Sequence, residues 1–229
     1  MPAALITGGS SGIGLAIARA LKEDGYELTV SSRRQERVDA AASELGAHGV
    51  AADVSREEDC ERLVAAHREQ FGSLDVLVNS AGIGIGGRVE ELSTKYFDLQ
   101  LAVNLRGLFL VTKLSLPLLR ESRGWIVNLA SVAGTVPTPG LSAYGASKAA
   151  VIALTRTLNA ELERDGIRAV AICPAFVDTP MAEWSGIPGE EMIQPDDCAE
   201  LVRFLLRLSP YARVPQVVIE RLHAGDLPG

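Results

Sequence analysis

A glycine-rich turn close to the start of the sequence limits the fold more than any other feature. The apolar run AALIT (residues 3–7) stops at TGGSSGIG, and the apolar residues of the following LAIARALKEDG recur at helical spacing until Gly25. Gly8, Gly12 and Gly14 allow a sharp turn, a close approach of a pyrophosphate to main-chain N–H groups, and tight packing of the helix on a sheet. We therefore predict a strand, a phosphate-binding turn and a helix.

The same alternation of apolar runs and helical patterns continues along the chain. Further strands are predicted in YELTVSS, HGVAADVS, LDVLVNSAG, GWIVNLAS, GIRAVAICP and VPQVVIE, with helices between them. Strands that alternate with helices form a parallel sheet covered on both faces, with the ligand at the carboxyl ends of the strands. We expect a Rossmann-type, doubly wound α/β fold of about seven strands, in a single domain over residues 1–229 with a short lid at about 179–194.

A Tyr-x-x-x-Lys motif begins the longest helical pattern in the second half of the chain. In a helix, Tyr144 and Lys148 project from one face one turn apart, which places an ammonium beside a phenol. A nearby cation lowers the pKa of a phenol, which is otherwise near 10. Ser131 ends the apolar run GWIVNLAS, so its hydroxyl can face the same pocket. Either these three side chains act together in catalysis, or Tyr144 packs in the core and Lys148 is solvated.

The sequence resembles the short-chain dehydrogenase/reductase family in the order and spacing of these motifs. The segment at 79–82 adds Asn-Ser-Ala-Gly, where the family usually has Asn-Asn-Ala-Gly. The resemblance implies hydride transfer between a nicotinamide and a carbonyl or alcohol carbon. Tyr144 would exchange a proton with the substrate oxygen, and Ser131 would hydrogen-bond that oxygen. Lys148 would lower the pKa of the tyrosine and bind the nicotinamide ribose.

The resemblance also implies roles for residues outside this group. Asn104 would distort a long or broken helix over 94–120, hold a water molecule and complete a proton path to the lysine; otherwise it faces solvent. Asp53 would contact the adenine amino group, cap the next helix, or do both, and Thr179 would bind the nicotinamide carboxamide. The full implied cofactor site is Gly8, Ser10, Ser11, Gly12, Ile13, Gly14, Arg33, Arg34, Asp53, Val54, Asn79, Ala81, Gly82, Tyr144, Lys148, Pro174, Val177 and Thr179.

Two arginines stand where the second strand ends and the next helix begins. Positive charge is unfavourable at a helix N-terminus, so Arg33 and Arg34 either bind a phosphate or are simply solvated. Family members that use NAD have an aspartate at the end of this strand, whereas this chain has Ser32 followed by Arg33. The resemblance therefore implies a site for the 2′-phosphate of NADP(H), with carbonyl reduction as the direction of reaction.

Two other functions fit parts of the sequence. The segment GGSSG matches the GxSxG turn of α/β-hydrolases, with Ser10 as nucleophile, Asp196 or Asp197 as acid and His223 as base. The position of Ser10 ahead of almost the whole sheet argues against that function. A non-catalytic, NADP-binding regulatory protein with the same fold is the other alternative, although it would not need a Ser, Tyr, Lys and Asn group.

The loops near these motifs are candidates for the substrate pocket. The segment GIGIGG (residues 82–87) matches GxGxxG, but no helix pattern begins at its third glycine, so we interpret it as a loop along the cofactor. Phe176, Met181 and Trp184 either line an apolar pocket or pack within the lid. Pro174 is followed by Ala175 where the family has glycine, which leaves the path of this loop open.

The composition and net charge limit the kinds of ligand and partner that the protein is expected to bind. The net charge is −7 and the cations are scattered, so we expect no nucleic-acid or anionic membrane partner, and a small carbonyl or alcohol substrate instead. The three cysteines lack CxxC spacing and the three histidines share no ligand spacing, which argues against a disulfide framework and a metal site. We expect no signal peptide and no apolar run of transmembrane length, and therefore a cytoplasmic location.

One predicted helix carries more apolar surface than a single sheet needs. The segment LFLVTKLSLPLLRE is apolar almost all round, and the helix after Tyr144 is rich in small and apolar residues. We therefore expect a homodimer or homotetramer built on helix–helix contacts.

Overall fold

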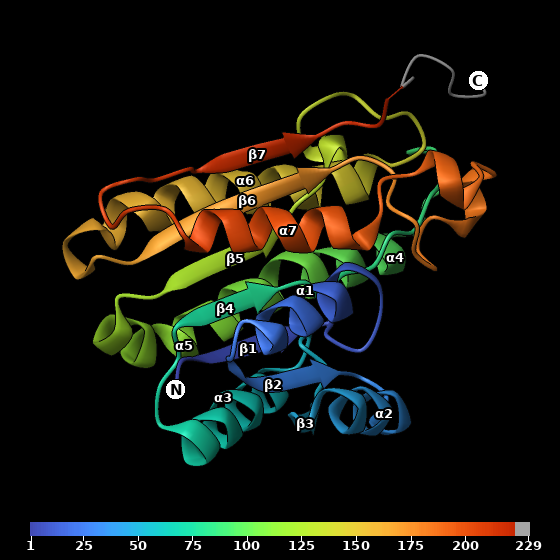
Figure 1. Cartoon of the computed structure of the whole chain (residues 1–229). Coiled ribbons are helices and arrows are strands. Elements are labelled where there is room, and N and C mark those ends of the chain that lie inside the picture. The colour runs from blue at the N-terminus through green and yellow to red at the C-terminus, as the bar shows by residue number, and fades with distance from the viewer. Residues whose placement is uncertain (223–229) are drawn as a thin grey trace.

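A seven-stranded, fully parallel sheet forms the centre of the computed structural model, which describes residues 1–222 (Figure 1). The strand order across the sheet is β3-β2-β1-β4-β5-β6-β7. The strands are β1 (Ala3–Thr7), β2 (Glu27–Ser32), β3 (His48–Ala51), β4 (Val76–Asn79), β5 (Trp125–Leu129), β6 (Arg168–Pro174) and β7 (Gln216–Ile219).

Helices fill the connections between the strands. The α-helices are α1 (Gly12–Glu23), α2 (Gln35–Leu45), α3 (Glu57–Phe71), α4 (Thr94–Leu101), α5 (Leu108–Ser122), α6 (Ser142–Glu161) and α7 (Pro195–Leu206). A π-helical segment, η1 (Ala102–Gly107), joins α4 to α5. Short 3₁₀ helices are η2 (Val132–Gly134), η3 (Glu163–Asp165), η4 (Glu183–Ser185) and η5 (Gly189–Glu191).

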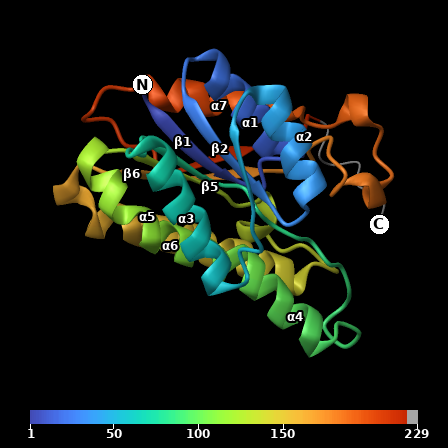
Figure 2. The ribbon, with the colours of Figure 1, turned by 90° about the horizontal axis from the view of Figure 1, so that it is seen from below.

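The sheet is buried on both faces, which explains why its central strands are continuous apolar runs. Successive side chains of β1 enter different cores: Ala4 and Ile6 pack with α1, α2 and α7, whereas Leu5 packs with α3, α5 and α6. Figure 2 shows the strands lying between these two helical layers. The predicted α/β, doubly wound parallel sheet of about seven strands is therefore confirmed.

The sheet reverses its winding direction at β1, and this reversal positions the ligand site. β1 pairs with β2 on one side, where Thr7 is opposite Ser31, and with β4 on the other, where Thr7 is opposite Asn79. The connections on the two sides leave in opposite directions, so a crevice opens above the carboxyl end of β1. Gly9 N donates to Ser31 O across the mouth of this crevice over 3.0 Å.

The helix predicted over residues 94–120 is continuous, but its pitch changes in the middle. α4, η1 and α5 follow one another without a gap. The span Thr94–Ser122 is long and apolar enough to cross a membrane by length and composition, so the expectation that no apolar run reaches that length is wrong. Half of the apolar window is buried inside the fold, where these helices pack against the sheet, α3 and α6.

Candidate active site

A cavity of about 540 Å³ lies above the carboxyl ends of β1 and β2. Its walls come from the β1–α1 turn, the start of α2, the β3–α3 loop, the segment after β4, and η1. The lining residues are Gly8, Ser10, Ser11, Ser31, Ser32, Arg33, Arg34, Arg37, Ala52, Asp53, Val54, Ala81, Gly82, Ile83 and Val103. Nine of the predicted cofactor residues therefore meet in one cavity although they come from four separate parts of the sequence.

The turn between β1 and α1 can accept only glycine at two positions. Gly8 and Gly12 have φ of +67° and +52°, in the left-handed region. A Cβ on Gly8 would lie 2.8 Å from Ala81 N, and one on Gly12 would lie 3.0 Å from Cγ2 of Thr179. Ser11 is at the N-cap position of α1 without a capping side-chain bond, so the first N–H groups of this helix are available to an anion. This turn fits a pyrophosphate.

Three arginines and two serines give the far end of the cavity an unpaired, donor-rich surface. Within residues 1–222, no ion pair holds the guanidinium groups of Arg33, Arg34 and Arg37. The buried hydroxyls of Ser31 and Ser32 have no hydrogen-bond partner. Guanidinium and hydroxyl donors that converge on one space without protein acceptors fit a phosphate group.

Arg37 belongs to this surface but is absent from the sequence-based prediction. It follows Arg33 by four positions and Arg34 by three, which is the spacing of neighbours on one helical face. That spacing was the signal that would have identified it.

The side chain of Asp53 is at the cavity wall and also organises its own loop. Its Oδ1 accepts hydrogen bonds from Ser55 N (3.0 Å) and Ser55 Oγ (2.7 Å). The N-cap position of α3 is occupied by Arg56, so Asp53 does not cap that helix. Its predicted contact with adenine remains compatible with this position.

Other predicted cofactor residues lie outside this cavity. Asn79 Nδ2 donates to Thr112 Oγ1 (3.1 Å) and to Asn128 Oδ1 (2.9 Å), so its side chain joins β4 to α5 and β5 within the core. Its direction follows from the alternation of side chains along β4. The remaining residues do not line the cavity; they lie in α1, at the end of β6 and in the chain that follows it: Ile13, Gly14, Pro174, Val177 and Thr179.

Ser131, Tyr144 and Lys148 converge beside this cavity as predicted. Ser131 follows β5 as the N-cap residue of η2, and Tyr144 and Lys148 lie in successive turns at the start of α6. The Ser131 hydroxyl lies close enough to the Tyr144 phenol to lower its pKa. Lys148 is buried; its Nζ donates to Leu129 O over 2.7 Å and lies 5.6 Å from the centroid of the Tyr144 ring.

Burial has the largest effect on the pKa values of Tyr144 and Lys148. It raises the pKa of the Tyr144 phenol above its ordinary value, while the Ser131 hydroxyl acts in the opposite direction. It lowers the pKa of the Lys148 ammonium to about 8. The expected lowering of the Tyr144 pKa by Lys148 is therefore not seen. The ammonium is hydrogen-bonded to Leu129 O and faces the ring of Tyr144.

Asn104 connects the distorted helix to both sides of the site. It lies in η1, so the predicted helix distortion is confirmed, and it is 1% exposed, which excludes the solvent-facing alternative. Its Oδ1 accepts from Ile83 N (2.8 Å), and its Nδ2 donates to Ile83 O (2.9 Å) and to Ser147 Oγ (3.0 Å). Ser147 Oγ donates in turn to Tyr144 O over 2.7 Å. The proton path through water remains a prediction.

Ser147 and Gln100 are positioning residues that were absent from the sequence-based prediction. Gln100 Oε1 accepts a hydrogen bond from Ile85 N over 3.0 Å, one helical turn before the contact that Asn104 makes with Ile83. Both polar side chains are fully buried. The signal for Gln100 was its spacing of four from Asn104, and the signal for Ser147 was its place between Tyr144 and Lys148.

The three apolar side chains near the lid differ in whether they pack on each other or lie next to the active site. Phe176 and Trp184 pack against each other edge to face, with ring centroids 5.9 Å apart. Met181 is 44% exposed, and its Sδ would lie 3.8 Å from a Cβ on Gly84, which would also contact the Tyr144 ring. Met181 therefore borders the space beside Tyr144, whereas Phe176 and Trp184 pack against each other, with Trp184 66% exposed.

The fold and this geometry define an α/β protein with a cavity that fits a dinucleotide at the switch point of its sheet. The sequence matches the family model described as short chain dehydrogenase over residues 2–186, and the chain belongs to that family. Members of the family bind nicotinamide cofactors, and the chain is an oxidoreductase of this class.

Similar proteins cover almost the whole chain. An uncharacterized oxidoreductase of Staphylococcus epidermidis is 36% identical over 94% of this chain and 95% of its own length. An alcohol dehydrogenase from Thermococcus sibiricus, complexed with 5-hydroxy-NADP, is 36% identical with a TM-score of 0.89 over 96% of both chains. A 3-ketoacyl-(acyl-carrier-protein) reductase from Brucella melitensis, complexed with NADH, is 32% identical with a TM-score of 0.88 over 96% of both chains.

The geometry gives no support to a serine hydrolase. Ser10 lines the cavity at the phosphate-binding turn. Asp197 Oδ2 accepts a hydrogen bond from Gln194 N over 2.8 Å, so this carboxylate caps α7. The proposed base, His223, lies outside the described residues.

The lowered pKa of Lys148 predicts a pH dependence of stability. In the unfolded chain the ammonium has its ordinary pKa of about 10.5, so between pH 8 and 10.5 the unfolded state binds more protons than the folded state. The free energy of unfolding should therefore gain about 3 kcal/mol from this group as the pH rises through that range. Urea unfolding of the wild type and of Lys148→Met at pH 7.5, 9 and 10.5 isolates the contribution as their difference. A difference that stays constant with pH would contradict this assignment.

Proposed function

We propose that this protein is an NADP(H)-dependent carbonyl reductase of the short-chain type, which acts on a small apolar carbonyl or alcohol substrate. One observation carries the proposal. A Cβ on Gly82 would lie 3.5 Å from both Asn104 Oδ1 and Lys148 Nζ, and Gly82 also lines the nucleotide cavity. The proton-handling side chains and the cavity therefore share a wall. A purely regulatory NADP-binding protein would have no use for a buried ammonium at that wall, because burying it costs stability.

The chain's own residues supply the proton chemistry. When bound, a reduced nicotinamide supplies a hydride. Tyr144 donates its phenolic proton to the substrate oxygen, and its raised pKa keeps that proton in place at neutral pH until the oxygen becomes basic. The Ser131 hydroxyl, which lies beside the phenol, stabilises the developing charge on the same oxygen. The Lys148 ammonium, held by Leu129 O, provides positive charge beside the ring and a donor toward the cofactor ribose.

The arginine surface supports NADP(H) over NAD(H). A 2′-phosphate placed near Arg33, Arg34 and Arg37 would satisfy cations and hydroxyls that have no protein partner among the described residues. The solved relatives divide on this point, since the Thermococcus enzyme is complexed with an NADP derivative and the Brucella enzyme with NADH. Because NADPH is the reducing cofactor, we assign carbonyl reduction as the direction. The three cysteines are unpaired, which suits the reducing cytoplasm that we propose as the location.

Replacing the phenol tests the reaction. Tyr144→Phe should lower the rate of carbonyl reduction by about 10²- to 10⁴-fold, because the proton donor is lost. Its affinity for NADPH, measured by fluorescence titration, should remain unchanged. Tyr211→Phe, at a 98% exposed position, is the matched control and should retain wild-type turnover. Retained turnover in Tyr144→Phe would remove this residue from the proposed role.

Replacing an arginine tests the choice of cofactor. The wild type should bind NADPH at least about tenfold more tightly than NADH, a difference of about 1.4 kcal/mol. Arg33→Gln should weaken NADPH binding and leave NADH binding unchanged, since only NADPH carries the phosphate. Arg164→Gln, an exposed position between α6 and β6, should alter neither affinity. Equal affinities of the wild type for both cofactors would overturn the assignment of the arginines and leave the reaction type standing.

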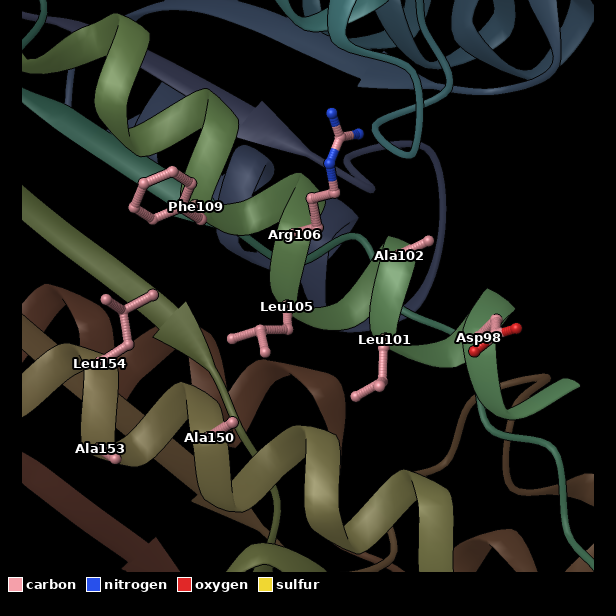
Figure 3. A pocket seen from close by; sticks show the side chains of 9 residues that line it. All are labelled: Asp98, Leu101, Ala102, Leu105, Arg106, Phe109, Ala150, Ala153 and Leu154. Carbon is pink, nitrogen blue, oxygen red and sulfur yellow. The ribbon is translucent and has the colours of Figure 1, made fainter. Parts of the chain in front are cut away.

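We also propose that the protein associates with a second copy of itself through the groove between α4–α5 and α6. This groove of about 710 Å³ is lined mostly by apolar side chains, and Phe109 at its edge is 48% exposed. Figure 3 shows Leu101 and Leu105 pointing from one wall towards α6, and Leu154 pointing back from α6. Helix surfaces of this kind are buried when two copies pack face to face.

A charged substitution in the groove tests the self-association. The wild type should elute as a dimer or tetramer in size-exclusion chromatography with light scattering at micromolar concentration. Phe109→Asp should shift it toward the monomer, because the carboxylate would be desolvated at the interface. Phe204→Asp is the control, since Phe204 is 58% exposed on α7 in the opposite layer. A monomeric wild type would contradict the proposal.

A further inference from the structure

Gly84 lies beside the ring of the reactive tyrosine. A Cβ built on Gly84 would have as its nearest neighbours Cδ2 and Cε2 of Tyr144, both at 3.7 Å, and Sδ of Met181 at 3.8 Å. Gly84 is exposed, and it lies in the loop of residues 82–87 that follows β4. A side chain at this position would therefore occupy the gap between the Tyr144 ring and the lid.

Neither the backbone nor the packing of the protein requires glycine here. The φ of Gly84 lies outside the left-handed region, unlike that of Gly87 at the end of the same loop, which is +150°. Contacts of 3.7 and 3.8 Å are ordinary van der Waals distances, so a methyl group would fit without displacing its neighbours. The absent side chain thus leaves room for a methyl group beside the Tyr144 ring.

The loop is held on both sides of Gly84, so the space has fixed walls. Ile83 is bound through both its N–H and its carbonyl by the side-chain amide of Asn104. The N–H of Ile85 donates to Gln100 Oε1, and Gly87 N donates to Gly140 O over 2.8 Å. A larger residue at position 84 could not swing away from Tyr144 without breaking one of these hydrogen bonds.

We propose that Gly84 is a specificity-determining residue of the substrate pocket, and that an apolar substituent of the substrate carbonyl occupies the gap between the Tyr144 ring and Met181. The inference rests on the function proposed above. The gap adjoins the phenol that donates the proton, and its other wall is a thioether, which is flexible and apolar. A pocket bounded in this way accepts bulky apolar groups next to the carbonyl carbon and shrinks when position 84 gains a side chain.

A graded series of carbonyl substrates tests the inference. We would measure kcat/KM with propanal, benzaldehyde and 2-naphthaldehyde for the wild type, Gly84→Ala and Gly84→Val. Gly84→Val should lower the ratio of the 2-naphthaldehyde value to the propanal value by about tenfold or more, and Gly84→Ala should give an intermediate ratio. Affinity for NADPH should not change in either variant, because Gly84 does not line the nucleotide cavity.

Gly86→Ala and Gly86→Val are matched controls from the same loop. Gly86 is also exposed and outside the left-handed region, but its Cβ would meet Gly140 O at 3.5 Å and Leu141 Cδ2 at 3.9 Å rather than Tyr144. Their substrate ratios should equal that of the wild type. If Gly84→Val does not fold, Gly84→Ala decides, since its methyl group makes only ordinary contacts.

The results distinguish failure of the proposed role of Gly84 from failure of the proposed reductase function. Active Gly84 variants whose substrate ratio equals that of the wild type overturn the role of Gly84 and leave the reductase assignment intact. A wild type that binds NADPH but reduces no member of the series also overturns the inferred apolar pocket. A wild type that binds neither NADPH nor NADH overturns the proposed function, and the role of Gly84 with it.

Discussion

The hydrogen bonds between the Asn104 side chain and the main chain of Ile83 are the contacts on which the active-site arrangement depends. A side-chain amide that both donates to and accepts from one residue acts like a neighbouring strand, and it fixes the loop after β4 where regular pairing has ended. The same amide donates a hydrogen bond to Ser147 Oγ, and Ser147 Oγ donates to the carbonyl of Tyr144. Asn104 can do this because η1 is π-helical, and single π turns inside α-helices recur at functional sites.

Burying the polar groups of the site lowers the stability of the folded protein. Lys148 is buried with a lowered pKa, and Leu129 O provides its hydrogen bond. Near it, buried asparagines and threonines form a chain from Asn79 through Asn128 to Thr155, which joins β4 and β5 to the helices behind them. Hydrogen-bonded polar groups in a core add less stability than apolar packing would, but they permit fewer alternative arrangements. Here they fix the relative positions of the two strands that lead into the catalytic loops.

The sequence allowed the architecture to be predicted because its signals are local. The strand–helix alternation, the glycine turn, and the spacing of Tyr144 and Lys148 each depend on a few adjacent residues. Features that depend on direction and burial could not be predicted in the same way. The Asn79 side chain faces α5 because of its place in the alternation along β4, and the pKa of Tyr144 is raised because desolvation outweighs any effect of a nearby cation. The spacing of Gln100 and Ser147 marks them as neighbours of the site, but their contacts with Ile85 N and Asn104 Nδ2 follow only from the fold.

The strand order has a consequence for how the chain is made. β1 lies in the interior of the sheet, yet its partner β4 is more than seventy residues away, with Thr7 opposite Asn79. A nascent chain therefore exposes one apolar edge of β1 until β4 has been synthesised, and unpaired strand edges promote aggregation. Pairings over such sequence separations also fold slowly. The glycine turn is synthesised first, but the wall that Ala81 gives its cavity is completed only when β4 has joined the sheet.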